Sequence, residues 1–596
     1  MFEYKAPMRD YKFVMQELLT SENHYQTLGY EEASSDMVDT ILSEAAKFTE
    51  QVIAPINQIG DQQGCYWENG NVTTPDGFKD AYKQYVDGGW PTLSQAEEFG
   101  GQGLPHSINM IVSEMLSAAN HSFSMYPGLS HGCMSTLQFH GTEQQKRMFM
   151  PKLVDGTWTG TMCLTESHAG TDLGLLRTKA ELNEDGSYKL NGSKIFISAG
   201  DHDLSDNIVH LVIARATDST AGTKGISLFV VPKFNVNYDG SIAGKNGVSC
   251  GSIEHKMGIN GNATCVINFD DAKGYLIGEK NKGLKCMFTF MNGARLGVAN
   301  EGVAASEAAF QGSLAYAQDR LQMRSLTGVK NPKGDADPII VHPDVRRMLL
   351  TQKSIAEGGR AMVAELAQLV DITHVGNSDD KLAAKNRLAL LTPIAKAFLT
   401  ETAVDSTSYG IQVLGGHGFI KEWGMEQLLR DTKICCIYEG TTGIQALDLI
   451  GRKVLGSKGV LLNDFIDEIK GFCKLNENNS VSALAHTLVD YVELWTEVTH
   501  DIGVKASANP DELGAASVDY LMLSGYITLG YMWVKMAKTA QDAISQNPDE
   551  EDFYLAKVQT AEFYFARVMP KAHGHLACLA NGAKTMMSLE SEHFSF

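Results

Sequence analysis

The hydrophobic pattern of this chain changes twice, and these changes limit the folds that are open to it. Between about residues 156 and 285, apolar residues gather in short runs rich in β-branched and aromatic side chains, which is typical of strands. The turn pairs Asp185-Gly186 and Asn191-Gly192 separate some of the runs. The runs are Thr159–Thr165, Tyr188–Leu190, Lys194–Ser198, Ile208–Ile213, Ile226–Val231 and Thr264–Phe269. They predict a small antiparallel β-domain between two helical blocks.

Helical periodicity dominates on both sides of this β-domain. Apolar residues recur at helical spacing from Val38 to Ala45, from Glu301 to Ala317 and from Leu484 to Trp495. The fold class that this order predicts is α+β. We expect an N-terminal extension (1–35), an N-terminal helical domain (36–155), the middle β-domain (156–285), a helical bundle (286–455) and a C-terminal helical domain (456–596).

The composition argues against several classes of protein. The 596 residues carry a formal net charge of −21, which opposes nonspecific binding to nucleic acid or anionic lipid. No apolar run approaches the roughly 20 residues of a membrane span, and the start lacks the basic-then-apolar order of a signal peptide. The ten cysteines include no Cys-x-x-Cys pair, so neither a metal site nor a disulfide framework is indicated. We expect a cytoplasmic protein with free thiols.

One stretch near the end of the predicted bundle carries a candidate catalytic acid. The apolar run Ile434–Tyr438 leads to Glu439 at the edge of a glycine turn, and a second periodic run follows from Ile444 to Ile450. This order predicts a helix, a tight turn and a helix. A carboxylate beside apolar residues is harder to ionise, so it can take a proton from carbon near neutral pH. By itself, the pattern more often marks a helix cap or a surface charge.

One further pattern matches a catalytic motif but lacks the structural context that the motif requires. The segment Gly128–Gly132 matches the nucleophile elbow of serine hydrolases, which requires a strand before the serine and a helix after it. Residues Met125–Gly128 do not read as a strand, so we interpret the segment as the start of a helix. No Gly-x-Gly-x-x-Gly opens a βαβ unit, and a Rossmann nicotinamide site is therefore not supported.

Several motifs, in order along the chain, give it a specific resemblance to a known family. They are Met162–Asp172, Leu190–Ser198, Gln412–Phe419 and Tyr438–Thr441. Over roughly residues 36–455 the chain resembles the acyl-CoA dehydrogenase flavoproteins. Segments Ile253–Ile259 and Met291–Leu296, with the extra C-terminal block, look like the subgroup that contains the 3-methylthiopropanoyl-CoA dehydrogenases.

The resemblance implies that the β-domain contacts the ring of an FAD cofactor. Met162, Leu164 and Thr165 match family positions at the flavin. The family usually has Trp and Thr where this chain has Phe196 and Ser198, but Phe still supplies a flat wall and Ser a hydroxyl. Taken alone, Phe196 reads as an ordinary strand core residue.

The same resemblance implies contacts to the rest of the cofactor from the helical bundle. Arg320 matches an arginine on the flavin pyrophosphate, for which a guanidinium is well shaped. The family often has glycine where this chain has Arg324, so the local loop is expected to differ. The remaining implied cofactor contacts are Thr441, Gln412, Gly415 and Gly416. In the family, the segment that matches Gln412, Gly415 and Gly416 typically contacts the FAD of a neighbouring subunit.

For the reaction itself, Glu439 matches the catalytic base of the family. Some relatives carry the base at the position of Ala294 instead, so Glu439 is the candidate that this chain offers. Many relatives also have Asp where this chain has Asn292. Taken alone, Arg295 reads as a helix-surface charge. The implied contacts to acyl-CoA are Thr171, Asn292, Arg295 and Gly440.

The implied activity is FAD-dependent α,β-dehydrogenation of an acyl-CoA thioester to the trans-2-enoyl-CoA. Glu439 would remove the α-proton, and flavin N5 would accept the β-hydride. A flavin ribityl hydroxyl and the backbone N–H of Glu439 would polarise the thioester carbonyl. The acyl group is 3-methylthiopropanoyl or a short, medium or long chain. The implied partners are an electron-transfer flavoprotein as acceptor and a second copy of the chain, in a homodimer or a dimer of dimers.

Three other functions stay open at this stage. The enzyme could be an oxidase that reduces O2, because the acceptor depends on access to the reduced ring. It could be a structural subunit with an empty flavin site. An alkylation-response flavoprotein that binds nucleic acid would need a basic C-terminal face. From Lys458 onward, however, the chain has 10 Lys and Arg against 19 Asp and Glu.

Overall fold

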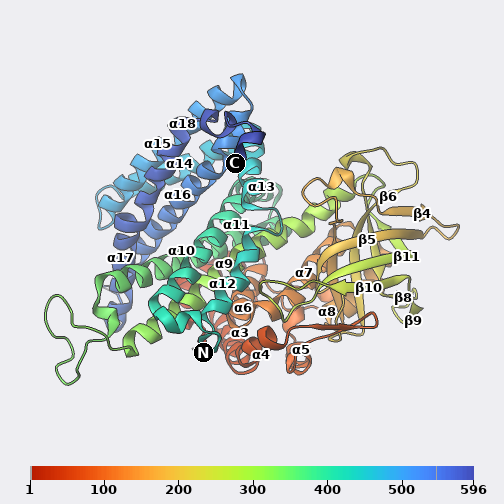
Figure 1. The fold of residues 1–596 in the computed structure, drawn as a ribbon, viewed down its shortest axis with the longest axis horizontal. Helices are drawn as coiled ribbons and strands as arrows, with labels where there is room; N and C mark the ends of the chain where they lie inside the picture. Colours follow the sequence, from red (N-terminus) through yellow and green to blue (C-terminus); the bar gives the residue numbers. More distant parts are fainter. Residues whose placement is uncertain (1–2, 545, 596) are drawn as a thin grey trace. The chain divides into compact units, whose positions relative to one another are not determined.

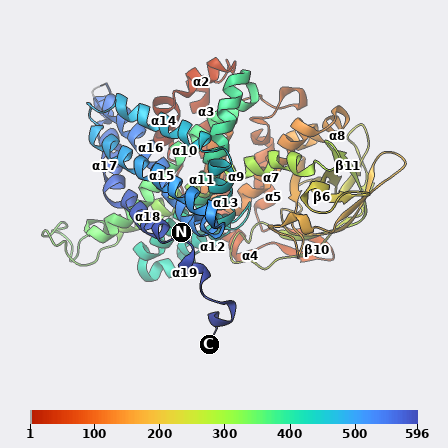
Figure 2. The same ribbon diagram turned by 90° about the horizontal axis from the view of Figure 1, so that it is seen from above.

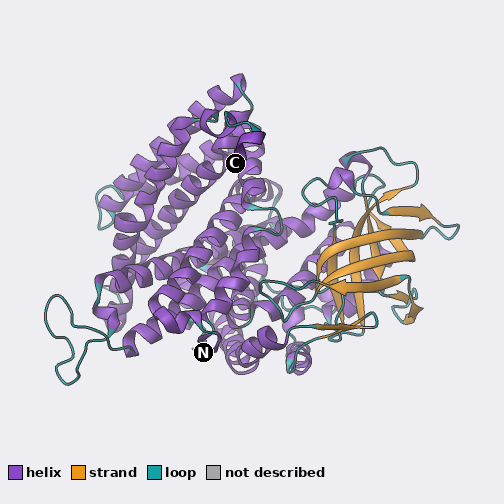
Figure 3. Ribbon diagram, in the orientation of Figure 1, coloured by secondary structure: helices purple, strands orange, loops and turns teal. Residues whose placement is uncertain are grey.

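The structure is a computed structural model that describes residues 3–544 and 546–595. It contains two compact units. The sheet unit is Thr40–Gly297, and the bundle unit combines Met1–Asp39 with Val298–Phe596. Figure 3 shows the long strands together in the sheet unit, while the bundle unit is helical. The predicted order of helices, then strands, then helices is confirmed.

Helices precede the main strands in the sheet unit. The helices are α3 (Ser35–Phe48), α4 (Asn57–Gln63), α5 (Phe78–Asp87), α6 (His106–Ala119), α7 (His121–His140) and α8 (Glu143–Val154). The strands are β1 (Tyr66–Glu68), β2 (Asn71–Thr73), β3 (Trp158–Cys163), β4 (Lys179–Leu182), β5 (Tyr188–Ser198), β6 (Asn207–Ala216), β7 (Ser227–Pro232), β8 (Phe234–Val236), β9 (Ile242–Lys245), β10 (Val248–Ile253) and β11 (Thr264–Ile277). Helix α9 (Gly283–Asp319) follows the last strand.

The main sheet has the strand order β10-β11-β5-β4-β6-β3, and β7 pairs with both β11 and β6. Figure 1 labels β4, β5, β6, β10 and β11 of this sheet. The sheet is mixed, whereas the sequence led us to expect antiparallel pairing alone. Strands β3 and β4 both run parallel to β6. The physical reason is the β4–β5 hairpin: β5 is antiparallel to β4, so the chain enters β6 in the direction of β4.

Helix α7 lies directly on β3 and fixes the position of this strand. A Cβ added to Gly160 would lie 2.3 Å from the Cβ of Cys133, so the contact requires glycine. The backbone N–H of Gly160 also donates to the Ser130 hydroxyl at 3.0 Å. One apolar cluster joins α7 and α8 to β3, β6 and β7, and another lies among β5, β6, β10 and β11. Both faces of the sheet are therefore packed.

The segment Gly128–Gly132 lies in the middle of α7, which corrects our interpretation that it starts a helix. The helix begins at His121. The Asn120 side chain caps it by accepting a hydrogen bond from the backbone N–H of Phe123. Pro127 lies inside this helix rather than at its start. Ser130 is buried and has no strand before it, so the segment is not a hydrolase elbow.

The bundle unit is built from helices of very different lengths. They are α1 (Met8–Lys12), α2 (Ser21–Thr27), the later part of α9, α10 (Pro343–Val375), α11 (Ser378–Leu414), α12 (Met425–Lys433), α13 (Thr442–Leu447), α14 (Val460–Leu475), α15 (Ser482–Ala508), α16 (Asp511–Ile544), α17 (Glu551–Phe563), α18 (Ala572–Asn581) and α19 (Lys584–Met587). Figure 2 shows the chain after α19 extending away from these helices. No helix of the described residues is both long enough and apolar enough to cross a membrane.

The stretch from Tyr520 to Ala537 is apolar on nearly every side because it belongs to helix α16, which other helices surround. It contacts α10, α11, α15, α17 and α18, so it is the central helix of the C-terminal block (Figures 1 and 2). Gly525 faces the ring of Phe398, and an added Cβ would lie 2.2 Å from that ring. The Trp533 indole N–H donates to the Ser354 carbonyl at 3.0 Å. The block is thus joined to the bundle by close packing and by a buried hydrogen bond.

A buried ionic cluster connects four helices, α1, α9, α10 and α17. Asp10 of α1 accepts short hydrogen bonds from Arg360 of α10 and from Lys557 of α17. Arg360 also donates to Glu307 at 2.8 Å, and Lys557 pairs with Glu357 at 2.8 Å. Burial raises the pKa of Asp10, but the charges of Lys557 and Arg360 outweigh burial and hold the pKa at about 2.

We predict that Asp10→Ala lowers the free energy of unfolding of the bundle unit by about 3–5 kcal/mol, because it leaves two buried cations without their shared carboxylate. Denaturant unfolding followed by tryptophan fluorescence measures the loss. The exposed Asp490→Ala on α15 is the matched control and should change little. The ordinary pKa of Asp10 is 3.8, so its stabilisation is present above that pH and is lost as the pH falls toward 2. Equal stability of the two variants would contradict a structural role for the cluster.

Candidate functional site

The loop after β3 carries two predicted flavin contacts and is held by a buried ion pair. Lys194 on β5 is fully buried, and its Nζ donates to the Leu164 carbonyl and to Glu166 Oε1, both at 2.9 Å. The backbone N–H of Ile195 donates to the Thr165 carbonyl at 2.9 Å. Burial raises the pKa of Glu166, but Lys194 and further donors hold it at about 2. The backbone that presents Leu164 and Thr165 is therefore fixed against β5.

The end of β5 presents an exposed aromatic ring. Phe196 is 60% exposed, although Ile197 beside it is only 2% exposed. Phe196 has φ +59°, an uncommon conformation for a bulky residue. It is therefore not a strand core residue, which was the alternative interpretation of the sequence. Half-buried Ser198 completes the predicted pair. An exposed ring leaves a flat face to which a planar ligand can bind.

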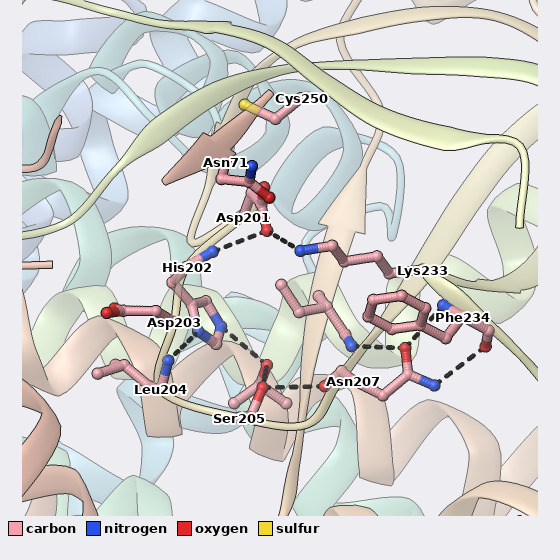
Figure 4. A network of polar contacts seen from close by, with 12 residues as sticks. Asn71, Asp201, His202, Asp203, Leu204, Ser205, Asn207, Lys233, Phe234 and Cys250 are labelled. Carbon is pink, nitrogen blue, oxygen red and sulfur yellow. Dashed lines mark hydrogen bonds and ion pairs between the residues drawn. The ribbon is translucent and has the colours of Figure 1, made fainter. Parts of the chain in front are cut away.

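A polar network fixes the chain just after Ser198 (Figure 4). Asp201 accepts from Lys233 Nζ at 2.5 Å and from the backbone N–H of His202 at 3.0 Å. Burial, together with Lys233, lowers the pKa of His202 to about 3, so its ring is neutral near pH 7. His202 Nδ1 can then accept from the backbone N–H of Leu204 at 3.2 Å. These contacts connect the loop after β5 to the end of β7.

The remaining predicted positions of the sheet unit lie on α9, on β3 and in a loop. Arg295 and Asn292 are one turn apart on α9, with 3.5 Å between a guanidinium nitrogen and the Asn292 Oδ1. Thr171 is exposed in the loop after β3, and Met162 is half-buried on β3. Ala294, the alternative position of the base, has no acidic side chain.

In the bundle unit, Arg320 directly follows α9 and opens a long loop. Its backbone N–H donates to the Tyr316 carbonyl at 2.9 Å, and its carbonyl accepts from the Ile339 N–H at 2.8 Å. The side chain itself is exposed. The backbone of Arg320 is thus held on both sides while the guanidinium stays accessible to a phosphate.

Asp337 organises the loop that follows Arg320. Its buried carboxylate accepts from the backbone N–H groups of Ser325, Lys330 and Asn331 at 2.7–2.9 Å, and from the Arg324 guanidinium at 3.2 Å. Burial raises the pKa of Asp337, but these donors outweigh burial and hold it at about 2. Where the family often has glycine, this chain thus has Arg324, whose guanidinium binds Asp337 at the centre of the loop.

The glycine pair after α11 has open space in front of it. A Cβ added to Gly415 or Gly416 would meet nothing within 4 Å, although Gly415 has φ +60°. At Gly418, by contrast, an added Cβ would lie 2.4 Å from the Ile411 carbonyl. Packing within the chain therefore explains Gly418 but not the pair, whose bare backbone leaves room for a ligand to approach. Gln412, one turn earlier, is exposed.

Tyr316, His417 and Trp423 connect this glycine pair to the Arg320 segment. The Tyr316 hydroxyl and His417 Nδ1 are 2.8 Å apart. The His417 and Trp423 rings stack with centres 4.5 Å apart, and Trp423 meets Tyr316 edge-on at 5.4 Å. Tyr316 lies one turn before Arg320, and His417 directly follows Gly416. The sequence interpretation missed these supporting aromatic residues because nothing in their spacing marks them.

Glu439 lies at a strained turn between α12 and α13, so the predicted helix–turn–helix is confirmed. Its φ is +55°, and Gly440 follows at +92°. Gln445 Nε2 donates to the Glu439 carbonyl at 2.9 Å, and Lys396 Nζ donates to the Gly440 carbonyl at 2.8 Å. The Glu439 side chain is half-buried. A non-glycine residue keeps such a backbone conformation when its surroundings fix it.

The residues on both sides of this turn are also anchored. The Tyr438 hydroxyl donates a short hydrogen bond to Glu301 of α9. Burial raises the pKa of Tyr438 well above its usual range, so the hydroxyl keeps its proton. The Thr442 hydroxyl donates to Glu401 of α11 at 2.5 Å. Thr441 is exposed and caps α13.

Comparison with models of known protein families identifies the family of this chain. Models of the acyl-CoA dehydrogenase N-terminal, middle and C-terminal domains match residues 35–157, 161–272 and 281–455. A further model, described as acetyl-CoA dehydrogenase C-terminal like, matches residues 465–590. The chain belongs to the acyl-CoA dehydrogenase family. It is therefore an oxidoreductase that acts on a CH–CH bond, and its cofactor is FAD.

Individual acyl-CoA dehydrogenases resemble this chain over almost its whole length. It is 40% identical to the 3-methylmercaptopropionyl-CoA dehydrogenase of Ruegeria pomeroyi, over 95% of this chain and 96% of that protein. It is 34% identical to a broad-specificity linear acyl-CoA dehydrogenase of Mycobacterium tuberculosis, over 96% of each. An acyl-CoA dehydrogenase of Bacillus anthracis, solved with FAD, shares the fold with a TM-score of 0.75 at 22% identity, over 94% of this chain and 91% of that chain.

The residues that this acyl-CoA dehydrogenase presents fit FAD. The exposed face of Phe196 suits a flat ring system, and the exposed Arg320 guanidinium suits a pyrophosphate. The uncovered Gly415 and Gly416 backbone suits the close approach of a phosphate. In each unit, residues far apart in the sequence support these positions, such as Lys194 for Thr165 and Tyr316 for the glycine pair.

We predict that Asp337→Ala raises the FAD dissociation constant roughly tenfold, because a loosened loop displaces Arg320 from the cofactor. Dialysis followed by flavin absorbance measures the retained FAD. Arg320→Ala should lose FAD in the same assay by removing the guanidinium itself. Asp335→Ala is the matched control, since Asp335 is exposed in the same loop. If Asp337→Ala retained FAD as firmly as Asp335→Ala, Asp337 would not position Arg320.

Proposed function

We propose that this acyl-CoA dehydrogenase uses Glu439 as its catalytic base and acts on 3-methylthiopropanoyl-CoA. The observation that carries the proposal is the turn at Glu439. A half-buried carboxylate lies on a left-handed backbone position, and both carbonyls of the turn are bound by side chains. Ala294 leaves the alternative base position without an acid.

Glu439 takes the proton from the carbon next to the thioester carbonyl. Negative charge then develops on the carbonyl oxygen, and a backbone N–H aimed at this oxygen stabilises it. The backbone N–H of Glu439 is the donor that we assign. The bound carbonyls of Glu439 and Gly440 keep the peptide planes of the turn from rotating. When bound, FAD supplies the acceptor for the hydride from the β-carbon.

We assign the binding roles residue by residue. Phe196 covers one face of the isoalloxazine, and Arg320 neutralises the pyrophosphate. Arg295 and Asn292 hold the CoA portion from α9. The other proposed cofactor contacts are Met162, Leu164, Thr165, Ser198, Gln412, Gly415, Gly416 and Thr441, and the other proposed substrate contacts are Thr171 and Gly440.

The substrate proposal is supported by the identity to the Ruegeria pomeroyi enzyme over almost the whole of both chains. The lower identity to an enzyme of broad specificity for linear chains makes butyryl and longer acyl groups the natural competitors. We further propose an electron-transfer flavoprotein as the acceptor and assembly as a homodimer or a dimer of dimers. We place the enzyme in the cytoplasm, in keeping with the free cysteines of the described residues.

We predict that Glu439→Gln keeps its FAD but loses turnover by roughly 10²- to 10⁴-fold, the usual contribution of a general base. The amide has nearly the same shape and cannot take the proton. Flavin absorbance gives the FAD content, and dye reduction with acyl-CoA gives the rate. The exposed Glu497→Gln on α15 is the control. Near-normal turnover of Glu439→Gln would remove Glu439 from the role of base.

We also predict that 3-methylthiopropanoyl-CoA reduces the bound flavin faster than octanoyl-CoA does. The apparent second-order rate constant of flavin reduction should be at least roughly tenfold higher, a difference that a fitted acyl pocket supports. Anaerobic stopped-flow with both thioesters, and with butyryl-CoA and palmitoyl-CoA, measures the ranking. Reoxidation by an electron-transfer flavoprotein should be much faster than reoxidation by air. Preference for palmitoyl-CoA would overturn the substrate assignment, and rapid reoxidation by O2 would make the enzyme an oxidase.

A further inference from the structure

Lys396 is a fully buried lysine that the proposed reaction does not use. It lies on α11, in a stretch where Ile394, Ala395 and Ala397 are also fully buried. Its Nζ donates to the Gly440 carbonyl at 2.8 Å, directly after the proposed base. Burying an ammonium is costly unless acidic groups compensate. The groups around Lys396 must therefore compensate for its burial.

Acidic groups gather around this lysine and around the turn that it binds. Burial lowers the pKa of Lys396, and the carboxylates of Glu439 and Glu301 act against this by favouring its charged form. Glu401 of α11 accepts a hydrogen bond from Thr442 on the far side of the turn, and Tyr438 binds Glu301 of α9.

The backbone of the turn needs this support. Glu439 at φ +55° has a conformation that is strained for a residue other than glycine. The hydrogen bond from Gln445 holds the Glu439 carbonyl, and that from Lys396 holds the next carbonyl, so two consecutive peptide groups are fixed. Without the Lys396 bond, the Gly440 peptide can rotate, since glycine allows many conformations.

We propose that Lys396 is the positioning residue of the catalytic base. It fixes the Gly440 peptide, so that Glu439 stays in its left-handed conformation, and its positive charge favours the ionised carboxylate that removes the proton. The inference rests on the proposed role of Glu439. Gln445 shares the first task, through the neighbouring carbonyl, but brings no charge.

The experiment compares Lys396→Met with Gln445→Leu in the FAD-loaded enzyme. For Lys396→Met we expect kcat to fall roughly 10- to 100-fold, the size of effect that a misplaced catalytic group produces. Its acidic limb of kcat against pH should move up by about one pH unit, because a carboxylate without a nearby cation is harder to ionise. Gln445→Leu should lower kcat without moving the limb. Lys385→Met, an exposed lysine on the same helix, is the control.

A second measurement is independent of turnover. Hydrogen–deuterium exchange of the peptide that covers residues 437–445 should rise in Lys396→Met and stay unchanged in Lys385→Met. If Lys396→Met does not accumulate as folded enzyme, Lys396→Gln carries the same test, since it also removes the charge and should shift the limb in the same direction.

The outcomes separate this inference from the function on which it rests. An unchanged kcat, pH limb and exchange rate in Lys396→Met, with Glu439→Gln inactive, would overturn the role of Lys396 alone. A fall in kcat without a shift of the limb would overturn the electrostatic part. Normal turnover of Glu439→Gln would instead overturn the base assignment itself.

Discussion

Buried side-chain charges that bind backbone fix the loops and the turn that carry Thr165, Arg320 and Glu439. Lys194 binds the Leu164 carbonyl, Lys396 binds the Gly440 carbonyl, and Asp337 binds the backbone N–H groups after Arg324. In each case the bound segment is a loop or turn that carries a proposed cofactor contact or the proposed base. A loop has no ladder of its own hydrogen bonds, so its shape must be fixed by such side chains.

This arrangement has a physical cost and a physical benefit. Removing an ammonium or a carboxylate from water is unfavourable, and it is compensated when several hydrogen bonds and an opposite charge are present. Glu166 beside Lys194 and Arg324 beside Asp337 supply that compensation. What the protein gains is a backbone that cannot relax, and this matters most at Glu439, whose conformation is strained. A flexible turn would let the carboxylate move away from the carbon that it must reach.

The sequence predicted runs within β3, β5, β6, β7 and β11 and the helix–turn–helix at Glu439, because local patterns of residue types specify them. The pair Asn191-Gly192, which the sequence suggested as a turn, lies inside β5. A resemblance carried by short motifs also assigned cofactor roles to Phe196 and Arg320. The sequence could not reveal the supports of those motifs. Arg324 and Asp337 are 13 residues apart, and Lys396 and Gly440 are 44 apart, so only the fold brings them together. The parallel pairing of β3 with β6 was missed for the same reason, since strand direction depends on the intervening hairpin.

The cluster around Asp10 extends the same principle from loops to whole segments. It joins α1, α10 and α17, which are far apart in the sequence, through charges that are buried only when all three segments are in place. Helix α16, buried on nearly every side, packs against α10 and α11, and α11 carries Lys396. A disturbance of the C-terminal block can therefore reach the helix that holds the Glu439 turn without any contact to substrate. The C-terminal block is thus joined by direct packing to the helix whose lysine binds the Glu439 turn.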